Sequence, residues 1–381
     1  MIELPISGIK RIQEMVKHNP EYISFAIGSL ELGGIPQQVK DYVQTLMPTI
    51  KTDYYDSNWG VLPFREKIVH VLAQRYGAHL PLNRVLATHG CMGALSLIYF
   101  SVLEPGDEVV IPEPYYPPYA TLAKVARCTP VLVSMAAPAG SDRLWEMDIE
   151  KIKAAVTPRT KIIIFSNPSN PLGSVMPLSD IENLMYWCDQ RGIYLVIDEA
   201  YRDYAFTPAY QTAFPLVSKS SHLIVTSTFS KMMAMSGWRV GFVVASEELT
   251  HAMASVQNTL FNCCNNIAQY AAMFSLDHPE FTEQFRVRIE KGLNTVFTEL
   301  KPLFDAGIFC CEKPEGGFFV LLKTDQVDAT DLCMSILKQA KVALVPGKSF
   351  GPSAASYLRL CFAREEDVLQ EGLFRLKSFF M

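Results

Sequence analysis

The middle of the chain alternates short, continuous apolar runs with helical patterns, and this alternation limits the possible fold more than any other feature. The runs are rich in Val, Ile and Leu and cover residues 84–88, 109–112, 130–134, 161–165, 194–197, 222–226 and 240–245. Continuous apolar strands are typical of a mainly parallel sheet that is covered by helices on both faces. The sequence therefore predicts an α/β domain around a mainly parallel seven-stranded sheet.

The chain changes character after about residue 280. A charged helical pattern leads into shorter segments that mix strands and helices, which predicts a smaller α+β domain. The first ~40 residues are too few to form a core of their own. We therefore expect an N-terminal segment (1–44) that packs with the small domain, a large domain (45–279) and a small C-terminal domain (280–381).

The charge and cysteine content argue against several classes of function. A net charge of −5 gives no electrostatic reason to expect nucleic acid or an anionic membrane as a partner. The N-terminus, MIELPISGIKRIQEM, lacks an apolar signal core, and no run approaches the ~20 apolar residues that span a bilayer. The cysteines lack the C-x-x-C spacing of metal or redox sites. We expect a soluble cytoplasmic protein with reduced thiols and no metal.

One lysine, Lys231, lies in an unusually apolar stretch, TSTFSKMMAMSGWRVG at 226–241. Lysine is normally a solvated surface residue, and burying its charge is unfavourable unless the amine is neutral or covalently used. One such use is a Schiff base with a carbonyl cofactor. The stretch thus indicates a covalent cofactor site.

Polar side chains follow several of the predicted strands. Asp198 directly follows the run 194–197, with Tyr201 three residues later, and Asn170 follows the run 161–165 within SNPSNPLG. Asp198 is equally compatible with a helix cap, and Asn-Pro pairs are ordinary turn formers. At the carboxyl ends of parallel strands, however, such side chains face the ligand crevice.

The segment GCMGA at 90–94 lies between a predicted strand and a predicted helix. Bare amides at a helix N-terminus suit a phosphate, although a tight turn also needs glycine. Thr228 and Arg239 offer the hydroxyl and the charge that a phosphate would also use.

The motifs H-E-x-x-H, G-x-S-x-G and G-x-G-x-x-G do not occur in the sequence. Their absence argues against the simplest zinc-protease, hydrolase and dinucleotide-binding interpretations.

Taken in order, these blocks resemble the class I/II aminotransferases of fold type I, the aspartate aminotransferase superfamily. The resemblance extends from about Ile23 to Leu376 and includes EPYYPPY, YLRLCFA, VPGKSFG and PEGGFFV. It implies pyridoxal 5′-phosphate as cofactor. It also implies a ping-pong transfer of an amino group from an L-amino acid to a 2-oxo acid.

The resemblance assigns the cofactor contacts residue by residue. Lys231 matches the Schiff-base lysine, and Asp198 matches the acid that pairs with the pyridine nitrogen. Tyr201 and Asn170 match donors to the phenolic oxygen, and Tyr116 matches the aromatic residue on the ring face. The amides of Cys91 and Met92, with Thr228 and Arg239, match the phosphate site. Lys231, Asp198 and Tyr201 are thereby the expected catalytic residues.

The resemblance also assigns contacts to the substrate and to a second subunit. Arg359 matches the arginine that binds the substrate α-carboxylate, together with Gly28 and Asn170. Tyr55, in YYDSNWG, matches a tyrosine that reaches the phosphate of the neighbouring subunit. A homodimer with shared active sites is therefore implied.

The substrate is the least determined part of this interpretation. Met92 stands where some dicarboxylate-selective relatives carry lysine, which favours neutral, apolar or aromatic amino donors, and Ile6 and Ile9 could line their pocket.

Other functions are compatible with the same residues. A carbon–sulfur lyase or another β/γ-eliminating enzyme would use the same lysine and aspartate. A non-enzymatic regulator would need a DNA-binding domain, and no basic helix-turn-helix pattern precedes Ile23. The segments GSLEL (28–32) and FNCCNN (261–266) depart from the family pattern and could reflect a specialised reaction.

Overall fold

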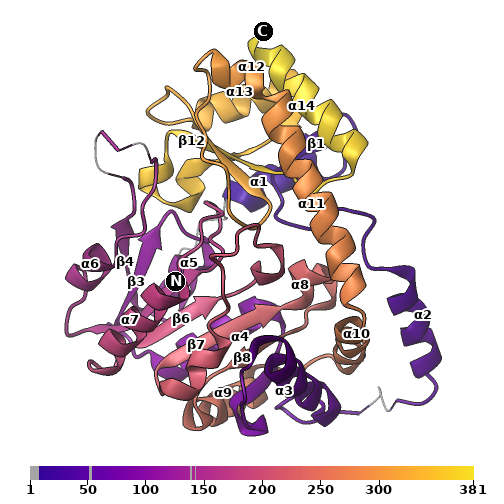
Figure 1. Ribbon diagram of the computed structural model, residues 1–381, viewed down its shortest axis with the longest axis vertical. Coiled ribbons are helices and arrows are strands. Elements are labelled where there is room, and N and C mark those ends of the chain that lie inside the picture. The colour runs from indigo at the N-terminus through magenta and orange to yellow at the C-terminus, as the bar shows by residue number, and fades with distance from the viewer. Residues whose placement is uncertain (1–7, 51–53, 138–139, 142) are drawn as a thin grey trace.

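A seven-stranded sheet forms the centre of the computed structural model, which describes residues 8–50, 54–137, 140–141 and 143–381 (Figure 1). The strand order is β2-β8-β7-β6-β5-β3-β4, and only β8 runs antiparallel to its neighbours. The strands are β2 (Val85–Thr88), β3 (Glu108–Glu113), β4 (Thr129–Ser134), β5 (Thr160–Ser166), β6 (Tyr194–Asp198), β7 (Leu223–Thr228) and β8 (Gly241–Val244). Each coincides with a predicted run, so the predicted mainly parallel sheet is confirmed.

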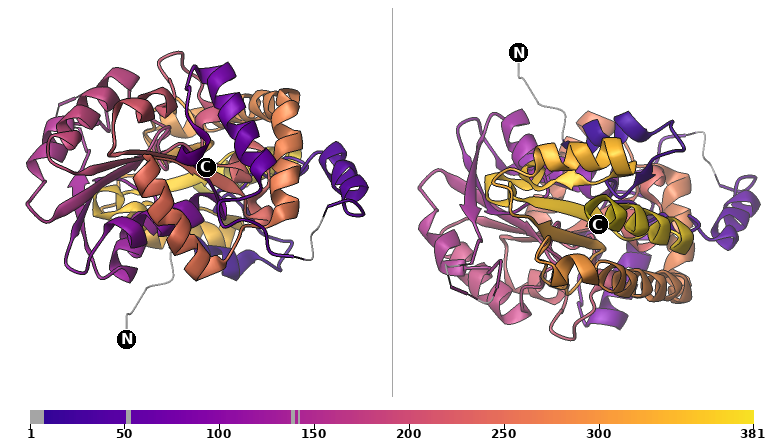
Figure 2. Two further views of the ribbon diagram at one scale, coloured as in Figure 1. Left: turned by 90° about the horizontal axis from the view of Figure 1, so that it is seen from below. Right: turned by 90° about the horizontal axis from the view of Figure 1, so that it is seen from above.

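Helices cover both faces of this sheet, as Figure 2 shows. Within β5, Ile162 and Ile164 point to one apolar core, while Ile163 and Phe165 point to the other. Because both faces are buried, the strand is apolar at successive positions. One face carries α4 (Gly90–Val102), α5 (Pro118–Val125) and α9 (Glu247–Phe261). The other carries α2 (Gln37–Leu46), α3 (Leu62–Tyr76), α6 (Ile149–Ala154), α7 (Leu178–Asp189) and α10 (Asn266–Asp277).

The C-terminal part of the chain forms a second core around a small antiparallel sheet, at the top of Figure 1. Its strand order is β11-β12-β9, with β9 (Phe319–Lys323), β11 (Val345–Pro346) and β12 (Tyr357–Cys361). Four helices accompany it: α11 (Pro279–Glu299), α12 (Lys301–Asp305), α13 (Thr330–Ala340) and α14 (Glu366–Phe380). No helix in the described ranges is long and apolar enough to cross a membrane.

The N-terminal segment contacts this second core in part. After α1 (Gly8–Val16), β1 (Ile23–Ser24) pairs in parallel with β10 (Val342–Ala343). Helix α2 instead packs against α10, where the rings of Tyr42 and Phe274 stack with centroids 4.4 Å apart. The segment therefore connects the two cores, and the predicted domain boundaries stay a prediction.

The carboxyl ends of three parallel strands place polar side chains side by side. Ser166 of β5 is the register partner of Asp198 of β6, which in turn is the partner of Thr226 of β7. Strand β12 brings Arg359 to the same place, where its guanidinium contacts Asn170. This edge of the sheet, closed from above by the second core, is where ligands bind in open α/β folds.

Candidate active site

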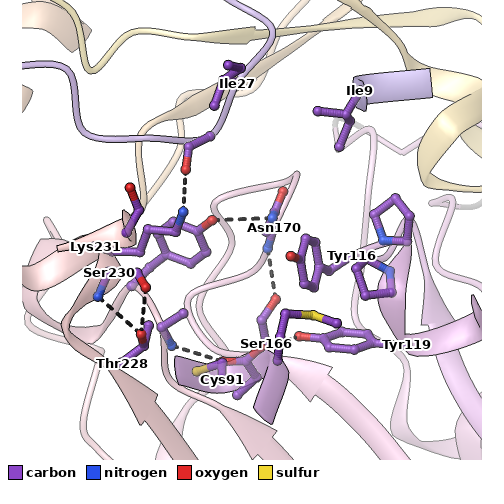
Figure 3. Close-up of a pocket in the computed structure, with 18 of the residues that line it drawn as sticks. Ile9, Ile27, Cys91, Tyr116, Tyr119, Ser166, Asn170, Thr228, Ser230 and Lys231 are labelled. Atoms are coloured by element: carbon purple, nitrogen blue, oxygen red, sulfur yellow. Dashed lines mark hydrogen bonds between the residues drawn. The ribbon is translucent and has the colours of Figure 1, made fainter. Parts of the chain in front are cut away.

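A cavity of about 290 Å³ lies at this edge and collects most of the predicted site residues (Figure 3). Its lining includes Gly28, Cys91, Met92, Tyr116, Asn170, Asp198, Tyr201, Thr228, Lys231, Arg239 and Arg359. These residues come from widely separated parts of the sequence. Their convergence on one cavity indicates a ligand site instead of separate structural roles.

Lys231 lies in α8 (Phe229–Met232), a single helical turn that directly follows β7. The hydroxyl of Thr228 caps this turn by accepting a hydrogen bond from the amide of Ser230 at 3.1 Å. The Lys231 Nζ atom donates to the carbonyl oxygen of Gly28 (Figure 3). Removal from water lowers the pKa of Lys231 to about 8, because burial disfavours the charged amine. The amine is thus partly neutral near physiological pH.

Asp198 is a buried carboxylate at the base of the cavity. Its Oδ2 atom accepts a hydrogen bond from the Tyr119 hydroxyl at 2.9 Å, and its Oδ1 atom accepts one from the Cys91 thiol at 3.3 Å. Burial raises the pKa of Asp198, whereas these donors lower it. A cation placed beside the carboxylate would offset the cost of burying it.

A chain of hydrogen bonds links the two cores across the cavity. Arg359 donates from Nη1 to Asn170 Oδ1 at 3.2 Å and from Nη2 to the Ala26 carbonyl at 2.6 Å. Asn170 in turn donates from Nδ2 to the Tyr201 hydroxyl at 3.3 Å. The Arg359 guanidinium lies between the rings of Phe319 and Phe350, 4.3 and 4.6 Å from their centroids.

The Arg359 guanidinium has one N–H donor without a hydrogen-bond acceptor in the described residues. Its Nε atom is buried without a hydrogen-bond partner among the described residues. Burial, the largest contribution, lowers the pKa of Arg359 to about 10, so the group still carries its charge at neutral pH. A charged, incompletely satisfied guanidinium beside a cavity suits a carboxylate ligand, which accepts two parallel hydrogen bonds.

The opposite end of the cavity offers an anion site at the start of α4. Gly90 begins this helix with a φ of +69°, and the side chain of the preceding residue, His89, does not cap the free amides. Arg239 donates from Nη2 to the His89 carbonyl at 3.0 Å and from Nη1 to the Ser236 carbonyl at 2.9 Å. A Cβ atom at position 90 would lie 3.1 Å from Arg239 Nη2, so glycine keeps this approach open. The amides, hydroxyls and charge match what a phosphate requires.

This donor set fits pyridoxal phosphate. A lysine amine can hold its aldehyde carbon, and a buried carboxylate can hold its ring nitrogen. The Tyr116 ring, edge-on to Tyr119 with centroids 5.5 Å apart, offers a face for the ring. The anion site would hold the phosphate. In the described part of the chain, no group of three or more His, Cys, Asp or Glu residues could hold a metal ion.

Tyr55 lies outside this cavity, unlike the other predicted site residues. Tyr55 is 82% exposed, and Tyr54 is 71% exposed. Both line a second cavity of about 630 Å³ with the segment 263–267. Ile9 does line the first cavity, whereas Ile6 lies outside the described residues.

Several residues that line the cavity were not predicted from the sequence. Tyr119, one turn after Tyr116, and Ser230, which directly precedes Lys231, both belong to motifs that were already noted. Their spacing could have indicated them. Lys10 and Gln13 of α1 line the cavity as well, and no motif marks them. The helix spacing of α1 shows that they share a face, but not what that face covers.

Comparisons with known proteins agree with this geometry. A family model for aminotransferase class I and II matches residues 22–376. The aspartate aminotransferase of Geobacillus stearothermophilus is 30% identical over 354 residues, covering 90% of this chain and 88% of that protein. A single mutant of Thermus thermophilus aspartate aminotransferase has a TM-score of 0.88 at 26% identity, covering 98% and 97%. The aromatic aminotransferase of Pyrococcus horikoshii OT3 has a TM-score of 0.86 at 26% identity, covering 98% of both chains.

Proposed function

The chain belongs to the aminotransferase class I and II family. We propose that its preferred amino donors are neutral, apolar or aromatic amino acids. The reaction itself is a pyridoxal-phosphate-dependent transamination, as in its relatives of fold type I. The family match favours this reaction over the elimination that the sequence alone left open. The apolar wall of the cavity carries the proposal on the substrate.

The site residues divide the chemistry among them. Bound pyridoxal phosphate supplies an electron sink. Lys231 would hold the cofactor through its amine, and the same amine, when free, would take the proton from the substrate Cα atom; a pKa of about 8 suits this exchange near neutral pH. Asp198 would keep a proton at the ring nitrogen, and Tyr201 and Asn170 would hold the phenolic oxygen. Arg359, with the backbone of Gly28, orients the α-carboxylate. A 2-oxo acid then accepts the amino group by the reverse steps.

The cavity wall beyond these polar groups is mostly apolar. Ile9 and Ile27 lie on the side opposite Cys91 and Thr228 (Figure 3), and Met92 lines the wall as well. An apolar side chain gains by leaving water for such a wall, whereas a second carboxylate would lose its hydration. Lys10 also lines the cavity and forms an ion pair with Glu14 at 3.3 Å. An aspartate preference would depend on that lysine.

A panel of amino donors tests the substrate proposal. We expect kcat/KM for leucine or phenylalanine to exceed that for aspartate by about 10-fold or more, because an apolar side chain is worth that much in a hydrophobic pocket. Met92→Lys should shift the ratio toward aspartate, while Met92→Leu, which keeps the wall apolar, should not. A wild-type preference for aspartate would overturn the proposal, and its loss in Lys10→Ala would assign that preference to the lysine. Ammonia and pyruvate formed without an added oxo acid would instead indicate elimination.

We also propose that two copies of the chain form a dimer with shared active sites. Tyr54, Tyr55, Leu260 and Phe261 are exposed, and the two tyrosines line one cavity with the segment 263–267, which follows Phe261 closely in the chain. Phe261 adjoins the anion site, since its ring centroid lies 4.8 Å from that of His89, whose carbonyl oxygen accepts a hydrogen bond from Arg239. Exposed apolar patches are typical of protein interfaces. The three-part domain division and the cytoplasmic location predicted from the sequence stay predictions.

The dimer proposal predicts a difference between two neighbouring tyrosines. Tyr55→Phe should weaken pyridoxal phosphate binding about 10- to 100-fold, the usual loss for a hydrogen bond to a charged group, without changing the molar mass measured by light scattering. Tyr54→Phe is the matched control and should bind the cofactor like the wild type. A monomer with full activity, or equal affinities for the two variants, would contradict shared active sites.

A further inference from the structure

The Asp198 carboxylate is held by side chains whose roles in the site are still unassigned. Beyond the bonds from Tyr119 and Cys91, its Oδ1 atom accepts from the Ala200 amide at 3.1 Å and lies 3.4 Å from the Thr226 hydroxyl. A carboxylate has about four acceptor positions, so these donors nearly fill it. The carboxylate is thus fixed in place even without a ligand.

The donors come from separate elements of the large sheet and its helices. Cys91 lies in the first turn of α4, Tyr119 lies in the first turn of α5, and Thr226 lies on β7. Figure 3 shows Cys91 and Tyr119 at the base of the cavity, away from Ile9 and Ile27. The starts of two helices are therefore tied to one acid by side-chain hydrogen bonds.

Both side chains remain hydrogen-bond donors over a wide pH range. Burial, followed by the charge of Asp198, raises the pKa of the Tyr119 hydroxyl and that of the Cys91 thiol well above their usual ranges. A protonated thiol is a poor nucleophile. Hydrogen bonding to Asp198 is thus the chemistry that the position of Cys91 supports.

The carboxylate needs these donors because its surroundings oppose its charge. Burial is the largest influence on the pKa of Asp198 and raises it, while the hydrogen bonds from Tyr119 and Cys91 are the two largest influences that lower it. A neutral carboxyl group could not favour a proton on the ring nitrogen of the cofactor by charge attraction. The two donors therefore act on the reaction through Asp198.

We propose that Tyr119 and Cys91 are positioning residues that keep Asp198 ionised and aimed at the cofactor ring. The proposal rests on the role of Asp198 in the proposed function. Tyr119 makes the shorter bond to the carboxylate and has the larger effect. Because both residues act on the same carboxylate, their effects are coupled.

The variants follow from the two bonds. Tyr119→Phe removes a hydrogen bond to a charged group, so kcat and pyridoxal phosphate affinity should each fall about 10- to 100-fold. Cys91→Ala should cause a smaller fall, and Cys91→Ser, which restores a hydroxyl donor, should recover most of it. The combined Tyr119→Phe and Cys91→Ala variant should depart from additivity.

Two matched controls remove similar groups elsewhere. Tyr99→Phe removes a buried hydroxyl that bonds the Tyr119 carbonyl at 3.0 Å, and Cys333→Ala removes a buried thiol that bonds the Leu344 carbonyl at 3.4 Å. Neither group touches Asp198. Both controls should bind pyridoxal phosphate with wild-type affinity.

The experiment measures the dissociation constant of pyridoxal phosphate for each apoprotein and the absorption spectrum of each holoenzyme between about pH 5.5 and 9. The charge of Asp198 acts on four neighbouring side chains, Tyr116, Tyr119, Tyr201 and Cys91. The pKa of each of them is raised, so each stays protonated over this pH range. We expect the pH at which the absorption spectrum of the bound cofactor changes to shift in Tyr119→Phe and Cys91→Ala. In Cys91→Ser it should return toward the wild-type value. A merely structural role would leave the transition unmoved.

Asp198→Asn distinguishes a failure of the proposed role of Asp198 from a failure of the proposed roles of Tyr119 and Cys91. If this variant binds pyridoxal phosphate like the wild type, the proposed role of Asp198 fails. If it binds weakly while Tyr119→Phe and Cys91→Ala match their controls in affinity and spectrum, the role of Asp198 stands and the present proposal is overturned.

Discussion

Replacing Lys231 by alanine is expected to reduce kcat for transamination by about 10⁴-fold or more, because the variant loses both the covalent anchor and the general base. The lysine amine donates to the Gly28 carbonyl within the cavity, and its pKa is lowered to about 8. Stopped-flow absorbance with a single amino donor measures the rate. The visible absorption of the bound cofactor should also change in the variant.

Two further variants separate the chemistry of Lys231 from its packing. Lys231→Arg keeps a positive charge, but a guanidinium is too weak an acid to exchange a proton near neutral pH, so this variant should stay inactive. Lys219, exposed and paired with Glu182 at 2.8 Å, provides the matched control, and Lys219→Ala should react like the wild type. A small primary amine added to Lys231→Ala should restore part of the rate. Wild-type rates in Lys231→Ala would overturn the assignment.

The sheet could be predicted from the sequence because the amino-acid composition of each strand indicates that both of its faces are buried. Every predicted run became a strand, since continuous Val, Ile and Leu suit strands that helices cover on both sides. The direction of β8 could not be predicted, because an antiparallel strand buried on both faces has the same composition. The short apolar segment 342–345 contributes to two strands in different sheets, β10 beside β1 and β11 beside β12. Strand β1 is distant in the sequence, so the segment itself does not reveal that its two halves pair in different sheets.

Site residues that belong to a recognisable motif could be predicted from the sequence. Site contacts that depend on how the elements pack could not. Lys231, Asp198 and Arg359 stand in recognisable blocks, and the fold brings them to one cavity. The bonds from Tyr119 and Cys91 to Asp198 join residues 79 and 107 positions apart. Such contacts depend on how two helices meet the sheet. From the sequence, only the amide of Cys91 was assigned a role. Its thiol contact with Asp198 could not be predicted, because the fold alone brings the two residues together.

Replacing Arg359 by alanine is expected to lower kcat/KM for amino acids by about 10²- to 10⁴-fold, because truncating one partner of a buried charge pair costs that much. The substrate α-carboxylate would lose its two-point contact, and Asn170 would lose the hydrogen bond to its Oδ1 atom. Arg359→Lys keeps a charge without the planar fork and should lose less. Steady-state kinetics over a range of amino acid concentrations measure both variants. Arg65, whose guanidinium binds the carbonyls of Val85 and Leu82, offers a matched control as Arg65→Lys.

A primary amine without a carboxylate distinguishes substrate binding by Arg359 from a structural role. If Arg359 binds the carboxylate, Arg359→Ala should lose activity toward the amino acid and keep its slow reaction with the amine, so that the ratio of the two kcat/KM values collapses. If the guanidinium only fills the space between Phe319 and Phe350, both reactions should fall together. Cofactor affinity provides the independent check, because the anion site lies at the other end of the cavity. An unchanged ratio in a variant that still binds pyridoxal phosphate would show that another group holds the carboxylate.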